Sequence, residues 1–307
     1  MSDSVEDKLM KIPLVRQLVM LLNRIILPGF NGLSLFHLLE IYIEGIIRGA
    51  FSARASSIAY SFFVAIFPFL LFILNLISFV SIDGFQQRFL VFVQELLPPK
   101  TQDFFLPVLE DIALNQRTEL TYITFFLTLF LAANGVNSIF TAFENSFLIR
   151  INRAFLRQYA VALVVAVALA IVMMIAVGII LYGEYAIFEL KGRAYISDEI
   201  VWIYLLQIVV FILMVYVVTA TLYHFGVKEG RQISFFSIGA LLTTLLFILT
   251  TYLFGVYINK FAQYNELYGS IGALLILMFY IWINSNLLLL GFELNISLQR
   301  LKEQNES

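Results

Sequence analysis

The sequence contains no cysteine, which excludes disulfide bonds, thiolate metal sites and cysteine nucleophiles. Histidine is nearly absent as well, because His37 and His224 are the only two. Neither belongs to an HxH or HxxxH pattern, so the clustered ligands of a metal-dependent nuclease are not expected. A GxxxxGK[ST] phosphate loop is also missing, which argues against an ATP-driven motor within the chain.

Charged residues are scarce in this chain. They make up 13% of the 307 residues, whereas 61% are hydrophobic and the mean hydropathy is +0.91. Soluble domains are typically about 25% charged and about 45–50% apolar. The 19 Lys and Arg residues nearly balance the 21 Asp and Glu residues, so no basic face is available for nucleic acid. The composition therefore indicates a protein whose solvent is a lipid bilayer.

The sequence contains long runs without charged residues. Each exceeds the ~20 apolar residues that cross a hydrocarbon core of ~30 Å. Their uninterrupted apolarity differs from the alternating pattern of a membrane barrel, so helices are expected. The predicted fold is an all-α polytopic membrane helix bundle, with a transmembrane domain at 55–298 and six spans, at about 55–82, 120–143, 158–183, 200–225, 233–258 and 270–295.

The distribution of Lys and Arg predicts the orientation of these spans. Thirteen of the 19 lie in the N-terminal segment, the second and fourth connections and the tail at 299–307. Cytoplasmic loops are rich in cations, so both termini are predicted to be cytoplasmic. An even number of spans agrees with a common side for both ends.

Amphipathic stretches flank the first span. Within the cytoplasmic segment 1–54, residues 33–51 form a predicted interfacial helix that carries His37, Glu40, Glu44 and Arg48 on one face. That face is interpreted as a solvated surface, with a cytoplasmic gate or docking surface as the alternative. The acidic outer loop at 83–119 contains two further amphipathic stretches, 85–97 and 102–116, which are expected to lie on the membrane or to cap the bundle.

Polar residues inside the spans are informative because no charge lies in the middle of any span. Pro68 removes a backbone hydrogen bond and predicts a kink in the first span. Amides and hydroxyls recur on one face of the second span, where they serve either as structural glue between helices or as a polar lining. The predicted substrate pathway combines such residues from spans one, two and six: Ser61, Pro68, Asn75, Asn134, Asn137, Thr141 and Asn286.

Residues at the span ends suggest two further features. At the inner end a charged layer is predicted, called here the cytoplasmic mouth; ordinary interfacial charge is the alternative reading. It comprises Arg54, Glu144 and Glu293. At the outer end tyrosines form a predicted aromatic cluster, and such clusters usually belong to the aromatic belt. The cluster comprises Tyr257, Tyr264 and Tyr268.

Two stretches of the sequence resemble a known family. ARASSIAYSFFVAIFPFLLFIL at 53–74 carries Ala59, Tyr60, Phe67 and Pro68, and 134–153 is similar to a middle motif more loosely. The stretch 257–295 carries a C-terminal signature, with matches at Tyr257, Tyr264, Tyr268, Gly269, Trp282, Gly291, Glu293 and Asn295. These stretches resemble the YihY/BrkB family of bacterial membrane proteins. The resemblance implies six helices in a bacterial cytoplasmic (inner) membrane. Names attached to the family include "virulence factor" and the historical label "ribonuclease BN"; transport of envelope lipids or glycolipids has been suggested for it.

The leading functional hypothesis is a transporter or lateral-access channel for a lipid or lipid-linked amphiphile of the cell envelope. A non-catalytic membrane scaffold that recruits an envelope-assembly protein partner is the alternative. A proton-coupled transporter ranks third and requires Glu144 or Glu293 to titrate. The sequence shows no paired acid and base beside a basic phosphate site, so ribonuclease activity is not expected. Membrane lipids are the expected partners; no nucleic acid, metal or cofactor is expected, and the oligomeric state is left open.

Overall fold

The computed structural model describes residues 13–26, 34–36, 40, 51–77, 85–96, 102, 106–107, 121–146, 149, 153–192, 199–228, 234–261 and 270–306. The regular elements within these ranges are helices, as the predicted all-α class requires. They are α2 (Pro13–Arg24), α4 (Phe51–Ile77), α5 (Phe85–Leu96), α7 (Thr121–Glu144), α8 (Phe155–Gly192), α9 (Glu199–Gly226), α10 (Ile238–Phe261) and α12 (Ser270–Glu306).

Five helices of the described chain are long and apolar enough to cross a membrane, namely α7, α8, α9, α10 and α12. α4 carries a shorter apolar stretch, Phe51–Ile66, within its 27 residues. Each predicted span therefore falls on one helix. The count of six crossings and the cytoplasmic position of the termini stay predictions.

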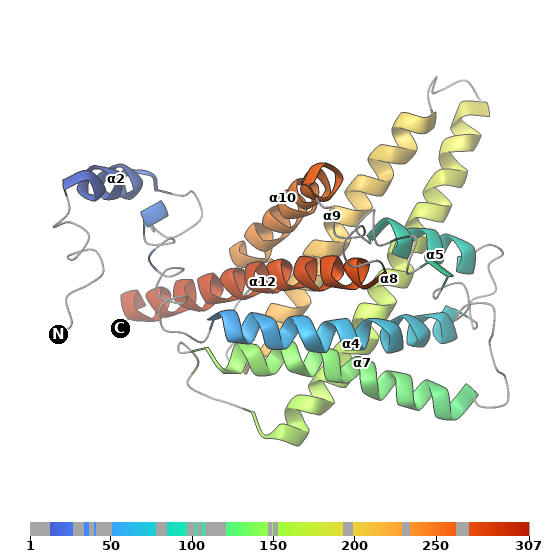
Figure 1. Cartoon of the computed structure of the whole chain (residues 1–307), viewed down its shortest axis with the longest axis horizontal. Helices are drawn as coiled ribbons and strands as arrows, with labels where there is room; N and C mark the ends of the chain where they lie inside the picture. Colours follow the sequence, from blue (N-terminus) through green and yellow to red (C-terminus); the bar gives the residue numbers. More distant parts are fainter. Residues whose placement is uncertain are drawn as a thin grey trace.

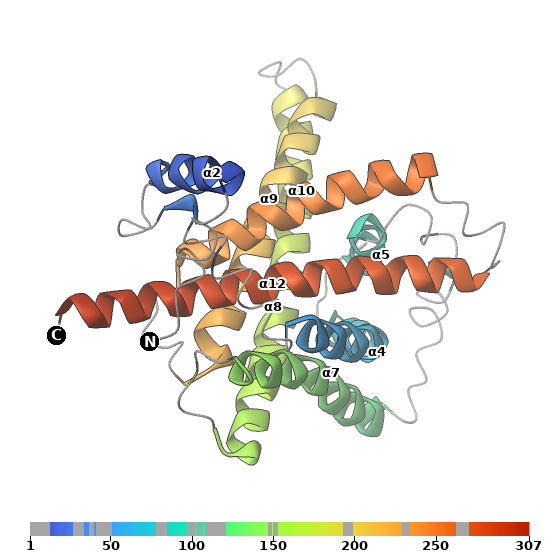
Figure 2. The ribbon, with the colours of Figure 1, turned by 60° about the vertical axis from the view of Figure 1, so that its left-hand side comes forward.

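The long helices form a layered bundle (Figures 1 and 2). α4 lies between α7 and α12, and α10 packs on α12. The hairpin of α8 and α9 crosses these helices at a steep angle. α8 has 38 residues and extends beyond the predicted span 158–183 at both ends, because no proline interrupts it before Gly192. At 1.5 Å per residue it is about 57 Å long, so it must tilt strongly or project beyond a ~30 Å hydrocarbon core.

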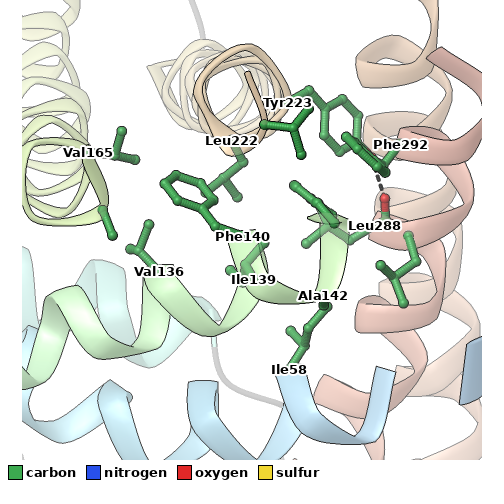
Figure 3. Packing of buried hydrophobic residues seen from close by; sticks show 14 of the residues in the cluster. Ile58, Val136, Ile139, Phe140, Ala142, Val165, Leu222, Tyr223, Leu288 and Phe292 are labelled. Carbon is green, nitrogen blue, oxygen red and sulfur yellow. Dashed lines mark hydrogen bonds between the residues drawn. The ribbon is translucent and has the colours of Figure 1, made fainter. Parts of the chain in front are cut away.

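Aromatic side chains fill the centre of the bundle where α7, α9 and α12 meet (Figure 3). Phe143 of α7 stacks on Phe292 of α12 with ring centroids 4.1 Å apart, and Tyr223 of α9 packs beside them. On α8, Ala162 and Ala166 are fully buried in the same cluster. Small residues let neighbouring helices approach closely, which is a usual source of helix association in membranes.

α5 corresponds to the first amphipathic stretch predicted in the outer loop. Its apolar side chains Phe89, Phe92 and Val93 are buried against α4 and α8, so this helix caps the bundle. Arg88 on its outer side pairs with Glu184 of α8 at 3.1 Å. The stretch 102–116 and the predicted helix 33–51 lie largely outside the described residues.

Two helical segments lie outside the predicted spans. The predicted tail at 299–307 is helical through Glu306, because good helix formers continue α12 without a glycine or proline. α2 was not predicted at all, although Pro13 occupies the first helical position, where proline is favoured, and apolar residues follow at helical spacing.

Candidate functional site

The predicted substrate pathway is spread over different environments. Ser61 and Pro68 are half-buried on α4, which continues as a helix through the proline, and the side chain of Asn75 lies outside the described residues. Asn286 donates its amide hydrogen to the carbonyl of Trp282 on its own helix, at 2.7 Å. Among the described members, the side-chain hydrogen bonds of Asn137 and Thr141 go to α8 and that of Asn286 stays on α12, so none of them joins the three helices.

The polar stripe of α7 turns toward α8 and the protein surface. Gln158 of α8 donates to the side-chain oxygens of Asn137 and Thr141, at 3.1 Å and 2.9 Å. Asn134 and Thr141 are exposed, and Asn137 is half-buried. The name seam amides is used below for four residues, of which Thr141 contributes a hydroxyl: Asn134, Asn137, Thr141 and Gln158. They lie where α7 and α8 meet.

The opposite side of α7 explains this orientation. A Cβ atom on Gly135 would lie 2.5 Å from the Cβ of Ala65, so the backbones of α4 and α7 nearly touch there. An amide side chain has no room on a face that packs this closely. The stripe therefore lies on the other side of α7. Helical spacing shows that these residues share a face, but it does not show which neighbouring helix that face meets.

Two of the three predicted mouth residues meet directly. Arg54 of α4 donates from Nη1 to Oε1 of Glu293 on α12 at 2.8 Å, and from Nε to the carbonyl of Ala142 at 2.8 Å. Ser146 donates to the other carboxylate oxygen of Glu293 at 2.6 Å. The residues Arg54, Ser146 and Glu293 are only 8%, 4% and 2% exposed. This arrangement ties α4, the end of α7 and α12 together.

Glu144, the third predicted mouth residue, lies beside this pair rather than in it. Its carboxylate accepts a hydrogen bond from the backbone N–H of Arg153 at 3.1 Å. The guanidinium of Arg153 donates to the carbonyls of Phe225 and Gly226 at 2.6 Å and 3.3 Å. A cation is favourable at the C-terminus of a helix such as α9, where carbonyls lack helical partners. Arg54, Glu144, Ser146, Arg153 and Glu293 are called the buried charge cluster below.

One donor in the buried charge cluster has no acceptor. Nη2 of Arg54 is buried and makes no hydrogen bond within the described residues. A buried donor without a partner costs about 1–3 kcal/mol, and more when the group is charged. Ionisable groups inside membrane bundles are rare and usually mark functional positions. The cluster is therefore a better site candidate than an ordinary layer of interfacial charge.

A second polar network lies next to this cluster and was not anticipated. Tyr223 donates to the carbonyl of Leu288 at 2.7 Å, and its hydroxyl lies 2.7 Å from that of Thr243. Asn295 accepts from the backbone N–H of Gly239 and donates to Ser237, both at 2.8 Å. These bonds join α9, α10 and α12.

Glycine is required where this network forms. A Cβ atom on Gly291 would overlap the hydroxyl of Thr243 on α10 and lie 2.6 Å from the hydroxyl of Tyr223, so any larger residue would push α12 away from both α10 and α9. Gly291 and Asn295 both belong to the C-terminal stretch that carries the family resemblance. That stretch was the one signal in the sequence for this network, because the partners come from helices distant in the chain.

Together these contacts gather the same ends of six helices. The starts of α4, α8 and α10, the ends of α7 and α9, and the later part of α12 are connected by the hydrogen bonds described above. The α8–α9 hairpin takes part in this gathering although it crosses the other helices at a steep angle (Figures 1 and 2).

This arrangement can be compared with known proteins. Residues 43–307 match the profile of the family described as virulence factor BrkB. The chain belongs to this family. It is 23% identical to the "putative ribonuclease-like protein YfkH" of Bacillus subtilis over 254 residues, which is 82% of this chain and 91% of that protein. It is 26% identical to a "UPF0761 membrane protein" of Coxiella burnetii over 248 residues, covering 78% and 84% of the two chains.

The family and the apolar helices together identify a multi-pass membrane protein. No solved structure is significantly similar to the chain. The "ribonuclease-like" name belongs to a distant relative. In the part of this chain that the structure describes, no three His, Asp or Glu side chains gather as they would around a metal ion.

Proposed function

We propose that this BrkB-family protein is a transporter or lateral-access channel for a lipid or lipid-linked amphiphile in the bacterial cytoplasmic membrane. The observation that supports the proposal is the position of Asn134 and Thr141 on a surface that acyl chains would otherwise cover, with Asn137 half-buried and Gln158 buried beneath them. The hydrogen bonds of Gln158 go to Asn137 and Thr141 and leave the exposed amide of Asn134 unused. Polar groups left unpaired in hydrocarbon are unfavourable, so a polar occupant at this face is expected.

The seam residues of α7, namely Asn134, Asn137 and Thr141, lie on only one half of this helix. In the preceding half of that helix, the exposed side chains among residues 125–133 are Phe126, Leu127 and Phe130. With the predicted orientation, the polar half belongs to the cytoplasmic leaflet. A headgroup would therefore enter the seam from the inner leaflet while its acyl chains stay in the bilayer.

The chemistry of the seam suits hydrogen bonding to a headgroup. Gln158 uses its amide hydrogens on Asn137 and Thr141, which leaves its carbonyl oxygen and the amide hydrogens of Asn137 without partners among the described residues. Donors and acceptors are thus available side by side. At the same end Arg54, Ser146 and Glu293 are buried and bonded to one another, and entry along the surface would leave these contacts intact.

Reconstitution tests this proposal. Vesicles containing the full chain and phosphatidylglycerol or phosphatidylethanolamine with a fluorescent headgroup are treated with an impermeant quencher, which reports movement between leaflets. The variant Asn137→Leu/Thr141→Val/Gln158→Leu should slow movement by at least tenfold. Gln207→Leu, an amide replacement on α9, is the matched control and should leave the rate unchanged.

The outcomes separate the proposal from its alternative. Movement that the seam variant does not slow would contradict a role for the seam. Folded protein that moves neither probe, but still retains an envelope protein on co-purification, would favour the scaffold function instead.

A further inference from the structure

The carboxylate of Glu293 is held as a bound anion would be. A guanidinium N–H of Arg54 and the hydroxyl of Ser146 each donate to one of its oxygens, at 2.8 Å and 2.6 Å. All three residues are more than nine-tenths buried. An arginine combined with a serine hydroxyl is a donor set that also suits phosphate oxygens.

The fit between Arg54 and Glu293 is incomplete. Nε of Arg54 is used by the carbonyl of Ala142 and Nη1 by Glu293, but Nη2 has no acceptor in the described part of the chain. Both oxygens of Glu293 are already engaged. A phosphate group has more acceptor oxygens than a carboxylate and could bond to Nη1, Nη2 and the Ser146 hydroxyl together.

We propose that Arg54 and Ser146 form a binding site for the phosphate group of an anionic headgroup, and that Glu293 occupies this site as an internal competitor. This inference concerns the substrate of the proposed function, and the role of the site in transport rests on that function. The two anions exclude each other, because a carboxylate and a phosphate cannot share one buried guanidinium without strong repulsion.

Charge balance supports exchange rather than simultaneous binding. Within the buried charge cluster, Arg54 pairs with Glu293, whereas the guanidinium of Arg153 donates to the end of α9 and its backbone N–H donates to Glu144. If Glu293 moves away, Arg54 is left as an unpaired buried cation. Breaking such a pair is strongly unfavourable, so an incoming anion would be required to compensate Arg54.

The exchange would also loosen the bundle. Arg54–Glu293 is a direct link between α4 and α12 at this end, and the indole of Trp282 donates to Ser56 at 3.2 Å nearby. Phosphate binding at Arg54 would release α12 from the first of these links. The arrangement seen here is then the state in which Glu293 fills the site.

Binding to the purified full chain in an uncharged detergent tests the inference. The probes are inorganic phosphate and dihexanoyl phosphatidylglycerol, and dihexanoylglycerol serves as the uncharged control. Coupling between competing sites typically changes affinity about 5- to 150-fold, so Glu293→Gln should bind at least fivefold more tightly than the wild type. Binding of both phosphate probes would show that the site recognises phosphate alone, and binding of the lipid only would show that the acyl part contributes.

Variants at Arg54 complete the test. Arg54→Lys keeps the positive charge but lacks the second NH₂ group of the guanidinium. In the Glu293→Gln background it should bind phosphate at least fivefold more weakly. Arg54→Gln/Glu293→Gln removes both charges, leaves no unpaired buried ion and should not bind phosphate. Elution as a single species confirms that each variant is folded.

An unchanged or weaker affinity in folded Glu293→Gln would overturn the inference and leave a purely structural ion pair. Because this assay needs no vesicles, its outcome is independent of lipid movement. Binding without movement would remove only the proposed function, and movement without binding would remove only the phosphate site.

Discussion

Replacing Arg54 with methionine removes the cation from a buried ion pair and leaves the carboxylate of Glu293 with Ser146 as its remaining donor. The two charged side chains are 8% and 2% exposed, so water cannot readily replace the lost partner. Removing one member of a buried pair typically costs about 3–5 kcal/mol, whereas replacing both members with apolar residues is often neutral or stabilising. Arg54→Met and Glu293→Met should therefore each destabilise the protein by about 3–5 kcal/mol.

The double variant Arg54→Met/Glu293→Met should recover most of that loss. The free energy of unfolding is measured for all four proteins by SDS titration in mixed micelles, with loss of helical circular dichroism as the signal. A strong favourable coupling between the two substitutions is expected. If each single variant costs less than about 1 kcal/mol, the pair behaves like a solvent-exposed one and the burial argument is refuted.

Two further predictions concern stability elsewhere in the bundle. Gly291→Ala should sharply reduce the yield of folded protein, because the added methyl would overlap the hydroxyl of Thr243 and lie 2.6 Å from that of Tyr223; a normal yield and elution profile would contradict the close packing of α12 on α9 and α10. Arg88→Gln should cost less than about 1 kcal/mol in the same SDS titration, because Arg88 is 52% exposed in its pair with Glu184; a larger loss would mean that α5 depends on this ion pair.

The sequence predicts the helices of this fold well because bilayer thickness and charge leave few alternatives. The uncharged run at 120–143 corresponds to α7 at Thr121–Glu144, and the apolar spacing at 85–97 corresponds to α5 at Phe85–Leu96. The ends of α8 and α12 were less predictable. A helix does not stop where its apolar run stops unless a glycine, a proline or a cap ends it.

The candidate site was less predictable because it depends on which faces meet. Periodicity placed Asn137 and Thr141 on one side of a helix, but their partner Gln158 was visible only as the start of the next span. Arg54 and Glu293 could be assigned to the same membrane side, yet nothing in their 239-residue separation indicates a pair. Ser146 was missed for the same reason.

Hydration of the seam is the most direct test of the central claim that the seam amides accept a polar headgroup. The chain has no cysteine, so a single spin label can be attached at Asn134→Cys, with Leu213→Cys on an exposed apolar part of α9 as the control. In vesicles, the label at 134 should be accessible to a water-soluble nickel relaxing agent, whereas the label at 213 should be accessible mainly to oxygen. Equal, oxygen-dominated accessibility at both positions would mean that acyl chains cover the seam, and would contradict its role as a headgroup path.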